Sequence, residues 1–96
     1  MYATIHRYAV GDSARDDLAD VGHHLGVALS KAAGFIAAVA VYVVDGGLLT
    51  IGLFEDRASL VAAEALAERW AAAHQVTLES GAGAAMNGEV VAQRGL

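Results

Sequence analysis

Apolar and polar residues alternate at the start of the chain and then recur at helical spacing. Residues 2–8 alternate with period two and are rich in β-branched and aromatic side chains, which is typical of a strand. Over residues 13–33 apolar residues recur every three or four positions and form one helix face. Ser13 followed by Asp16 matches a helix start signal, and Gly34 allows the positive φ that ends a helix.

A second run of elements follows this strand and helix. Residues 35–44 are almost continuously apolar and β-branched, which predicts a strand buried on both faces. The remaining elements are expected in this order: a tight hairpin turn at Asp45-Gly46-Gly47, a partner strand over 48–54, a helix capped by Asp56 and running to about His74, a loop over 75–86, and a last strand over Gly88–Arg94.

The order βαββαβ predicts a single α+β domain over residues 1–96, a ferredoxin-like sandwich with a four-stranded antiparallel sheet. In this fold both helices cover one sheet face. The hairpin strands nevertheless carry bulky apolar residues on both faces, which we expect to be grouped as Ile36 with Tyr42, Phe35 with Val41, and Leu49, Ile51 and Leu53 opposite Leu48 and Phe54. The uncovered face would be a large apolar patch, so a two-fold homodimer is predicted.

Composition and charge narrow the class of protein. The chain has 96 residues, 56% of them hydrophobic and 18% charged, which excludes intrinsic disorder. Without cysteine there is no disulfide or thiolate metal site, and the chain suits a reducing cytoplasm. Six basic against eleven acidic residues, with no basic cluster, argue against nucleic acid. No apolar run reaches the roughly 20 residues that span a membrane, and no signal peptide is evident. We expect a cytoplasmic, soluble protein.

Several residues are candidates for chemistry. Trp70 and His74 lie one helical turn apart, so they can share a cavity as stacking wall and proton acceptor, or Trp70 can be ordinary core. His23 and His24 diverge around a helix and are expected to be a solvated pair. On the first strand His6 and Arg7 face opposite sides, and the sequence alone leaves open which one faces the helices.

Short motifs along almost the whole chain resemble the dimeric α+β barrel superfamily, and within it the antibiotic-biosynthesis-monooxygenase-like group. The resemblance rests on these segments: Met1-Tyr2-Ala3-Thr4-Ile5, Leu29-Ser30-Lys31-Ala32-Ala33-Gly34-Phe35, Asp45-Gly46, Leu53-Phe54-Glu55-Asp56, and Ala58 with Ala62-Ala63. Ala33 stands where the group usually has the proline of Pro-Gly-Phe.

This resemblance implies a set of possible activities. The group includes cofactor-independent monooxygenases of polycyclic phenols, which often carry an asparagine and a tryptophan where this chain has Thr50 and Phe54; both departures count against that reaction. It also includes haem-degrading enzymes with a tryptophan and a histidine on the second helix, further apart than Trp70 and His74. Their pocket asparagine aligns loosely with Arg7, which favours Arg7 over His6 as the residue facing the cavity.

The leading expectation is therefore a small-molecule enzyme or binder that acts on aromatic or lipophilic compounds. If it is an enzyme, a monooxygenase-like oxidoreductase is expected. Thr50, Phe54 and Trp70 would line its cavity, and His74 and Arg7 are the catalytic candidates. The sequence has no metal-ligand spacing or nucleotide fingerprint, so no metal and no cofactor are expected. The alternatives are a non-catalytic dimeric barrel with a sensing or assembly role, and a haem-binding or haem-degrading protein.

Overall fold

The computed structural model describes residues 1–9, 15–43, 47–73, 77–78 and 85–96. The elements along the chain are β1 (Tyr2–Ala9), α1 (Arg15–Leu29), β2 (Phe35–Tyr42), β3 (Leu48–Phe54), α2 (Arg57–Ala73), β4 (Thr77–Leu78) and β5 (Ala85–Glu89). The predicted start signal at Ser13 and the turn residues Asp45 and Gly46 lie outside the described residues, whereas Gly47 has the expected positive φ of 119°.

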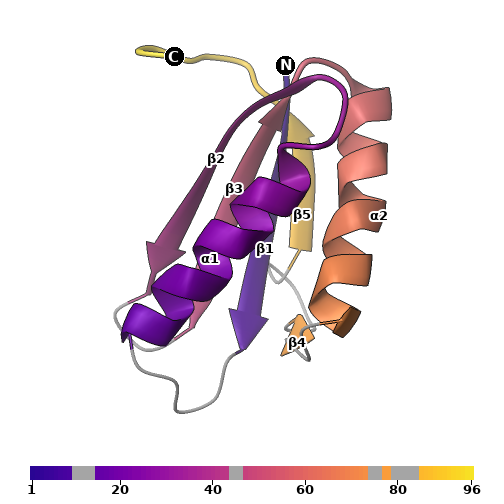
Figure 1. Ribbon diagram of the computed structural model, residues 1–96. Helices are drawn as coiled ribbons and strands as arrows, with labels where there is room; N and C mark the ends of the chain where they lie inside the picture. The colour runs from indigo at the N-terminus through magenta and orange to yellow at the C-terminus, as the bar shows by residue number, and fades with distance from the viewer. Residues whose placement is uncertain (10–14, 44–46, 74–76, 79–84) are drawn as a thin grey trace.

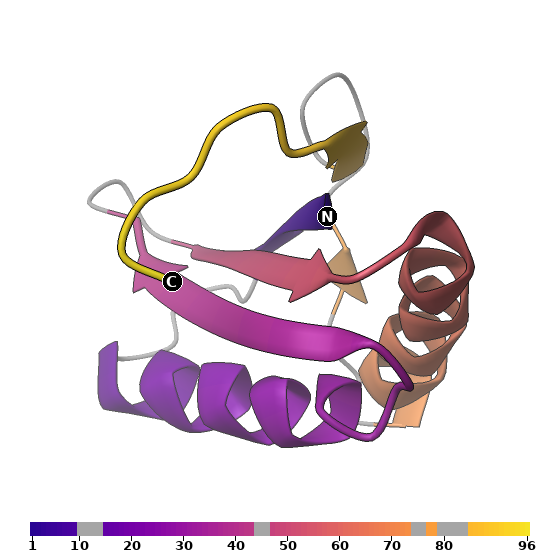
Figure 2. The ribbon, with the colours of Figure 1, turned by 90° about the horizontal axis from the view of Figure 1, so that it is seen from above.

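The strands form one antiparallel sheet in the order β2, β3, β1, with β4 and β5 both pairing with the far side of β1. Both helices lie on the same face of this sheet, and the opposite face carries no helix (Figures 1 and 2). This arrangement is the predicted ferredoxin-like α+β sandwich. Neither helix in the described ranges is long and apolar enough to cross a membrane.

The core lies between the helices and the sheet. Helix α2 begins after Asp56, whose Oδ1 accepts a hydrogen bond from the Ser59 backbone N–H at 2.8 Å, and this bond lowers the pKa of the Asp56 carboxyl. The helix then buries small side chains at Ala63 and Ala67, so it packs close to the sheet. The large buried side chains of the core are Tyr8, Leu25, Leu29, Leu48, Phe54, Leu60 and Trp70.

The last strand differs from the prediction. The sequence pattern predicted it at Gly88–Arg94, but β5 is Ala85–Glu89, and the short strand β4 occupies part of the predicted loop. The Val90 backbone N–H still donates to the Met1 carbonyl at 2.9 Å, after which the chain is exposed and unpaired in the described structure. The position of the last strand is set by its pairing with β1. The alternation within residues 88–94 carries no information about that pairing, so it did not predict where the strand begins and ends.

Strand β2 also departs from the prediction because it is an edge strand. None of its residues is buried in the single chain, so the expected burial on both faces is wrong there. A bulge between Phe35 and Ala37 shifts the alternation, so Phe35 pairs with the buried Phe54 while Val41 pairs with Leu49 on the open face. Grouping Phe35 with Val41 was therefore wrong. The predicted opposition of Leu49, Ile51 and Leu53 to Leu48 and Phe54 is confirmed by the burial pattern.

Gly34 holds the turn that leads from α1 into β2. The α-helix ends at Leu29, four residues before the predicted end, and hydrogen-bonded turns continue the chain to Gly34, which has a φ of 78°. A Cβ atom at Gly34 would collide with the Ser59 hydroxyl and lie 2.8 Å from the Ser59 Cβ. Both the backbone conformation and the close approach of α2 therefore require glycine.

Replacing this glycine by alanine is expected to be costly. Gly34→Ala should lower the free energy of unfolding by more than about 2 kcal/mol, because it adds left-handed strain to a steric clash. Gly26→Ala is the matched control, since a Cβ there meets nothing within 4 Å and alanine favours the helix by about 0.5–1 kcal/mol. Urea denaturation of both variants measures the difference, and equal effects would contradict this account of Gly34.

Candidate functional site

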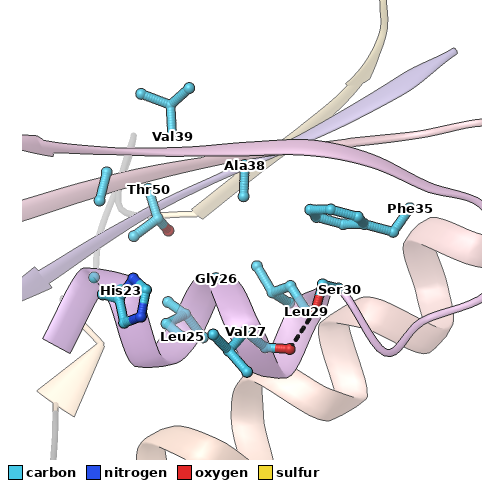
Figure 3. A pocket seen from close by; sticks show the side chains of 12 residues that line it. His23, Leu25, Gly26, Val27, Leu29, Ser30, Phe35, Ala38, Val39 and Thr50 are labelled. Atoms are coloured by element: carbon cyan, nitrogen blue, oxygen red, sulfur yellow. Dashed lines mark hydrogen bonds between the residues drawn. The ribbon is translucent and has the colours of Figure 1, made fainter. Parts of the chain in front are cut away.

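A pocket of about 390 Å³ lies between α1 and the strands β2 and β3. Its helix side includes Leu25, Gly26 and Leu29, and its sheet side includes Phe35 and Thr50, as Figure 3 shows. The walls are thus mainly apolar, which suits a small apolar or aromatic compound.

Small residues keep this pocket open. At Gly22 the helix approaches β2 so closely that an added Cβ would lie 2.6 Å from the Cβ of Ala40. One turn further along α1, a Cβ at Gly26 would meet nothing within 4 Å. Ala38 on β2 likewise leaves room on the facing wall (Figure 3). Gly22 therefore allows the close contact between α1 and β2. Gly26, which also lacks a side chain, leaves the space next to that contact empty.

Thr50 is the polar group in the floor of the pocket. Its side chain points from β3 toward α1, and the residue is only 6% exposed (Figure 3). Within the described part of the chain its hydroxyl makes no hydrogen bond with the protein. No fully buried side-chain oxygen of the described residues lacks a partner, so this hydroxyl retains access to the pocket. The Ser30 hydroxyl, by contrast, donates to the Val27 carbonyl at 2.6 Å, and His23 is exposed at the rim. Thr50 thus offers a free hydrogen-bonding group to a ligand oxygen.

A polar cluster lies on the same sheet face, under α2. Thr4, His6 and Tyr8 occupy alternate positions of β1 and are all buried. Glu64 from α2 reaches them: its Oε2 lies 3.1 Å from His6 Nε2, and its Oε1 accepts a hydrogen bond from the Thr4 hydroxyl. The Tyr8 hydroxyl lies 3.4 Å from His6 Nδ1. Each buried polar group on this part of β1 therefore has a partner.

The hydrogen bonds define the charge state of the cluster. Burial opposes ionisation of Glu64, but the hydrogen bonds from His6 and Thr4 outweigh it and lower the pKa of the carboxyl. The Glu64 carboxylate then accepts the Nε2–H of His6, which leaves Nδ1 as the acceptor for the Tyr8 hydroxyl. Burial, with the nearby Glu64 charge, raises the pKa of Tyr8 to about 12, so this phenol remains protonated.

Strand β5 adds one more contact to Glu64. With the Asn87 side-chain amide oriented so that its nitrogen faces the cluster, it donates to Glu64 Oε1 at 2.9 Å and to Thr4 Oγ1 at 3.1 Å. The carboxylate thus joins α2 to both β1 and β5.

The pocket and the cluster meet at one cross-strand pair. His6 on β1 lies directly opposite Thr50 on β3, and both side chains are buried on the helix side of the sheet. The Cβ atoms of such a pair are about 4.5–5.5 Å apart. A buried histidine with a carboxylate partner is thus adjacent to the floor of the pocket.

The structure changes the assignment of the candidate residues. The predicted orientation of Arg7 toward the cavity is wrong, because alternation along β1 places Thr4, His6 and Tyr8 on the helix side and Arg7 on the open face. Phe54 is fully buried and reaches the pocket only through its edge-to-face contact with Phe35, the ring centroids being 6.0 Å apart.

The structure therefore brings together only part of the predicted set of site residues. Trp70 is 9% exposed and belongs to the core, without lining the pocket, and His74 lies outside the described residues. Among the predicted site residues that the structure describes, Thr50 alone lines the pocket. Among the described residues, no three His, Cys, Asp or Glu side chains are grouped as metal ligands.

Sequence reasoning missed Glu64 and the pocket role of Gly26. The signal for Glu64 was the polar stripe Thr4, His6 and Tyr8, since a buried stripe of this kind demands a partner from the covering helix. For Gly26 the signal was a second small residue one turn after Gly22 on the same helix.

Comparison with known proteins gives structural but not sequence matches. No model of a protein family matches the chain, and no curated protein sequence matches it. A mutant of SnoaB, a cofactor-independent oxygenase from Streptomyces nogalater, is 16% identical with a TM-score of 0.66, covering 99% of this chain and 95% of its own. Rv0793 from Mycobacterium tuberculosis is 14% identical with a TM-score of 0.71, covering 98% of both chains. These likenesses confirm the predicted ferredoxin-like α+β fold.

The Glu64 contacts generate a pH-dependent prediction. The folded-state pKa of Glu64 is lowered, so its ionisation stabilises the folded protein above the unfolded value of about 4.3, and this stabilisation is lost as the pH falls through the folded pKa. Glu64→Gln should lower the free energy of unfolding by about 1–2 kcal/mol at pH 7. The difference from wild type should shrink between pH 5 and pH 3 in urea titrations, and parallel curves would contradict the assignment.

Proposed function

We propose that this protein is a small-molecule enzyme that binds an aromatic or lipophilic compound in the pocket beside α1, and that its reaction is of the cofactor-independent monooxygenase type. The observation that carries the proposal is the hydroxyl of Thr50, a largely buried residue: it has no hydrogen-bond partner within the described structure and projects into a mainly apolar pocket. A ligand oxygen bonded to Thr50 fixes the orientation of an otherwise apolar molecule. The SnoaB likeness supports this reaction class through the fold.

The size and chemistry of the pocket support this substrate class. Its volume of about 390 Å³ falls within the usual range of ligand pockets, roughly 300–1,000 Å³. Leu25, Leu29 and Phe35 supply the apolar walls. In a cofactor-independent oxygenation the substrate itself supplies the electrons: a CH₂ group and O₂ give a carbonyl and water. The protein then has to bind the substrate, orient it and manage its proton.

The candidate roles are revised accordingly. Thr50 binds the ligand, and Phe54 supports the pocket from behind through Phe35. Arg7 lies on the open sheet face, which we propose is a dimer interface. His74 follows the last described residue of α2 and stays a predicted catalytic candidate. The haem alternative rested on Trp70 and His74 of the second helix, and Trp70 belongs to the core, so we do not favour that alternative.

The open face supports assembly as a homodimer. It presents Ile5 and Ile51 at its centre, with Val39 and Val41 on β2 and Met86 on β5, and the last three are 41–55% exposed. A continuous apolar sheet face of this kind is seldom left in water, and a second copy offers a matching surface. The same face favours the second candidate function, a non-catalytic dimeric barrel with a sensing or assembly role. The absence of cysteine supports a cytoplasmic location for either function.

Filling the pocket tests the binding proposal. Gly26→Leu should abolish the rise in melting temperature that alizarin, a polycyclic phenol, produces in the wild type, because the new side chain extends into the empty space beside Gly26. Ala65→Leu, on the exposed side of α2, is the control and should bind normally. Thr50→Val should weaken binding about three- to tenfold by removing one hydrogen bond. Unchanged binding in Gly26→Leu would refute this pocket.

A charge on the open face tests the dimer. Ile51→Asp should convert a dimer to a monomer at micromolar concentration in analytical ultracentrifugation, because an unpaired carboxylate would be buried in the interface. Val61→Asp is the matched control: Val61 is 59% exposed on α2, on the helix side of the sheet. A wild-type protein that sediments as a monomer would rule out the dimer.

A further inference from the structure

The pocket proposal leaves His6 without a role. This side chain is only 5% exposed, yet it carries a ring that can take up a proton. Three polar side chains surround it: Tyr8 and Thr4 from its own strand, and Glu64 from α2. An apolar residue could fill the same place in the core without needing hydrogen-bond partners. A buried histidine held by three polar side chains therefore points to a function.

The contacts leave one particular atom of the ring available. Nε2 is held at 3.1 Å from the Glu64 carboxylate, which fixes the ring and favours a proton on that nitrogen. Nδ1 is then the basic atom. Its contact with the Tyr8 hydroxyl is 3.4 Å, longer than the usual O–H hydrogen bond of about 2.8 Å, so the Nδ1 lone pair is only weakly engaged. This is the arrangement of a base with an orienting carboxylate behind it.

The position of the ring relates it to the pocket. His6 and Thr50 are direct neighbours on β1 and β3, and Thr50 is the polar group of the pocket floor. His6 does not itself line the pocket, but it occupies the position beside Thr50 on the neighbouring strand, where a ligand hydroxyl bonded to Thr50 would approach it. The titratable groups that contact His6 in the described structure are Tyr8 and Glu64, while Asp20 and His23 of α1 are exposed.

We propose that His6 is the general base of this site, taking the proton from an acidic hydroxyl group, such as a phenol, of the ligand bound at Thr50. The inference rests on the proposed ligand pocket. In the step the ligand O–H bond breaks and an N–H bond forms at His6 Nδ1. The electron pair of the broken bond stays on the ligand oxygen, which keeps its hydrogen bond from Thr50.

The surrounding groups stabilise both products of this transfer. The imidazolium is balanced by the Glu64 carboxylate at Nε2, so the step leaves no unpaired positive charge in the core. Tyr8 stays protonated, so it adds no second negative charge beside Glu64. An electron-rich phenolate is also the form that reacts more readily with an oxidant, so the base would prepare the ligand for the proposed reaction.

The ionisation of bound alizarin tests this role directly, because its phenolate absorbs at a longer wavelength than the phenol. Wild type should lower the pKa of bound alizarin by about one to two pH units relative to the free dye. His6→Gln can still donate to Glu64 but cannot take up the proton, so it should bind the dye within about threefold of wild type. The pKa of alizarin bound to His6→Gln should equal that of the free dye. His24→Gln, exposed on α1 and outside the pocket, should retain the full shift.

Each outcome of this titration has a clear meaning. A shift that persists in His6→Gln would overturn the role of His6 and leave the pocket intact, whereas a wild type that does not bind alizarin would overturn both proposals for polycyclic phenols. If His6→Gln does not fold, ¹⁵N-histidine NMR of the wild type decides. The His6 ring should become an imidazolium when alizarin is added, and a ring that stays neutral beside bound phenolate would refute the transfer.

Discussion

The hydrogen bonding of one buried polar stripe constrains much of this structure. The period of two in β1 places Thr4, His6 and Tyr8 on the helix side of the sheet, where water cannot solvate them. Glu64 from α2 satisfies Thr4 and His6, and the Asn87 amide from β5 completes the set around the carboxylate. The rotation of α2 and the position of β5 must both agree with these contacts, so the site and the fold are specified together.

Local patterns were enough to predict most of the fold. Period-two and helical spacing located β1, β3 and both helices, and the glycines at 34 and 47 marked the turns, because these signals arise from backbone geometry alone. The last strand and the alternation of β2 were not predictable in this way. The register of β5 depends on pairing with β1, at the other end of the chain, and the bulge after Phe35 depends on the pairing of β2 with β3.

The site was less predictable because it depends on which face of a strand turns inward. Alternation showed that His6 and Arg7 point in opposite directions, but a shift of one residue exchanges them, and the family resemblance favoured the wrong one. Thr50 was found because the family resemblance places it where the monooxygenases carry an asparagine, and the burial pattern of β3 puts this position on the helix side. Glu64 needed the three-dimensional packing of α2, since no short-range pattern links it to residues near the N-terminus.

The two halves of the site have different structural requirements, and this difference explains their separation. The pocket beside α1 requires small residues in its walls. Gly26 and Ala38 leave space there that larger side chains would fill in a packed core. The cluster beside α2 requires the opposite, a close contact in which every polar atom has a partner. A single small domain accommodates both because each helix covers its own part of the sheet. At the His6–Thr50 pair, where β1 lies beside β3, the open pocket meets the hydrogen-bonded cluster.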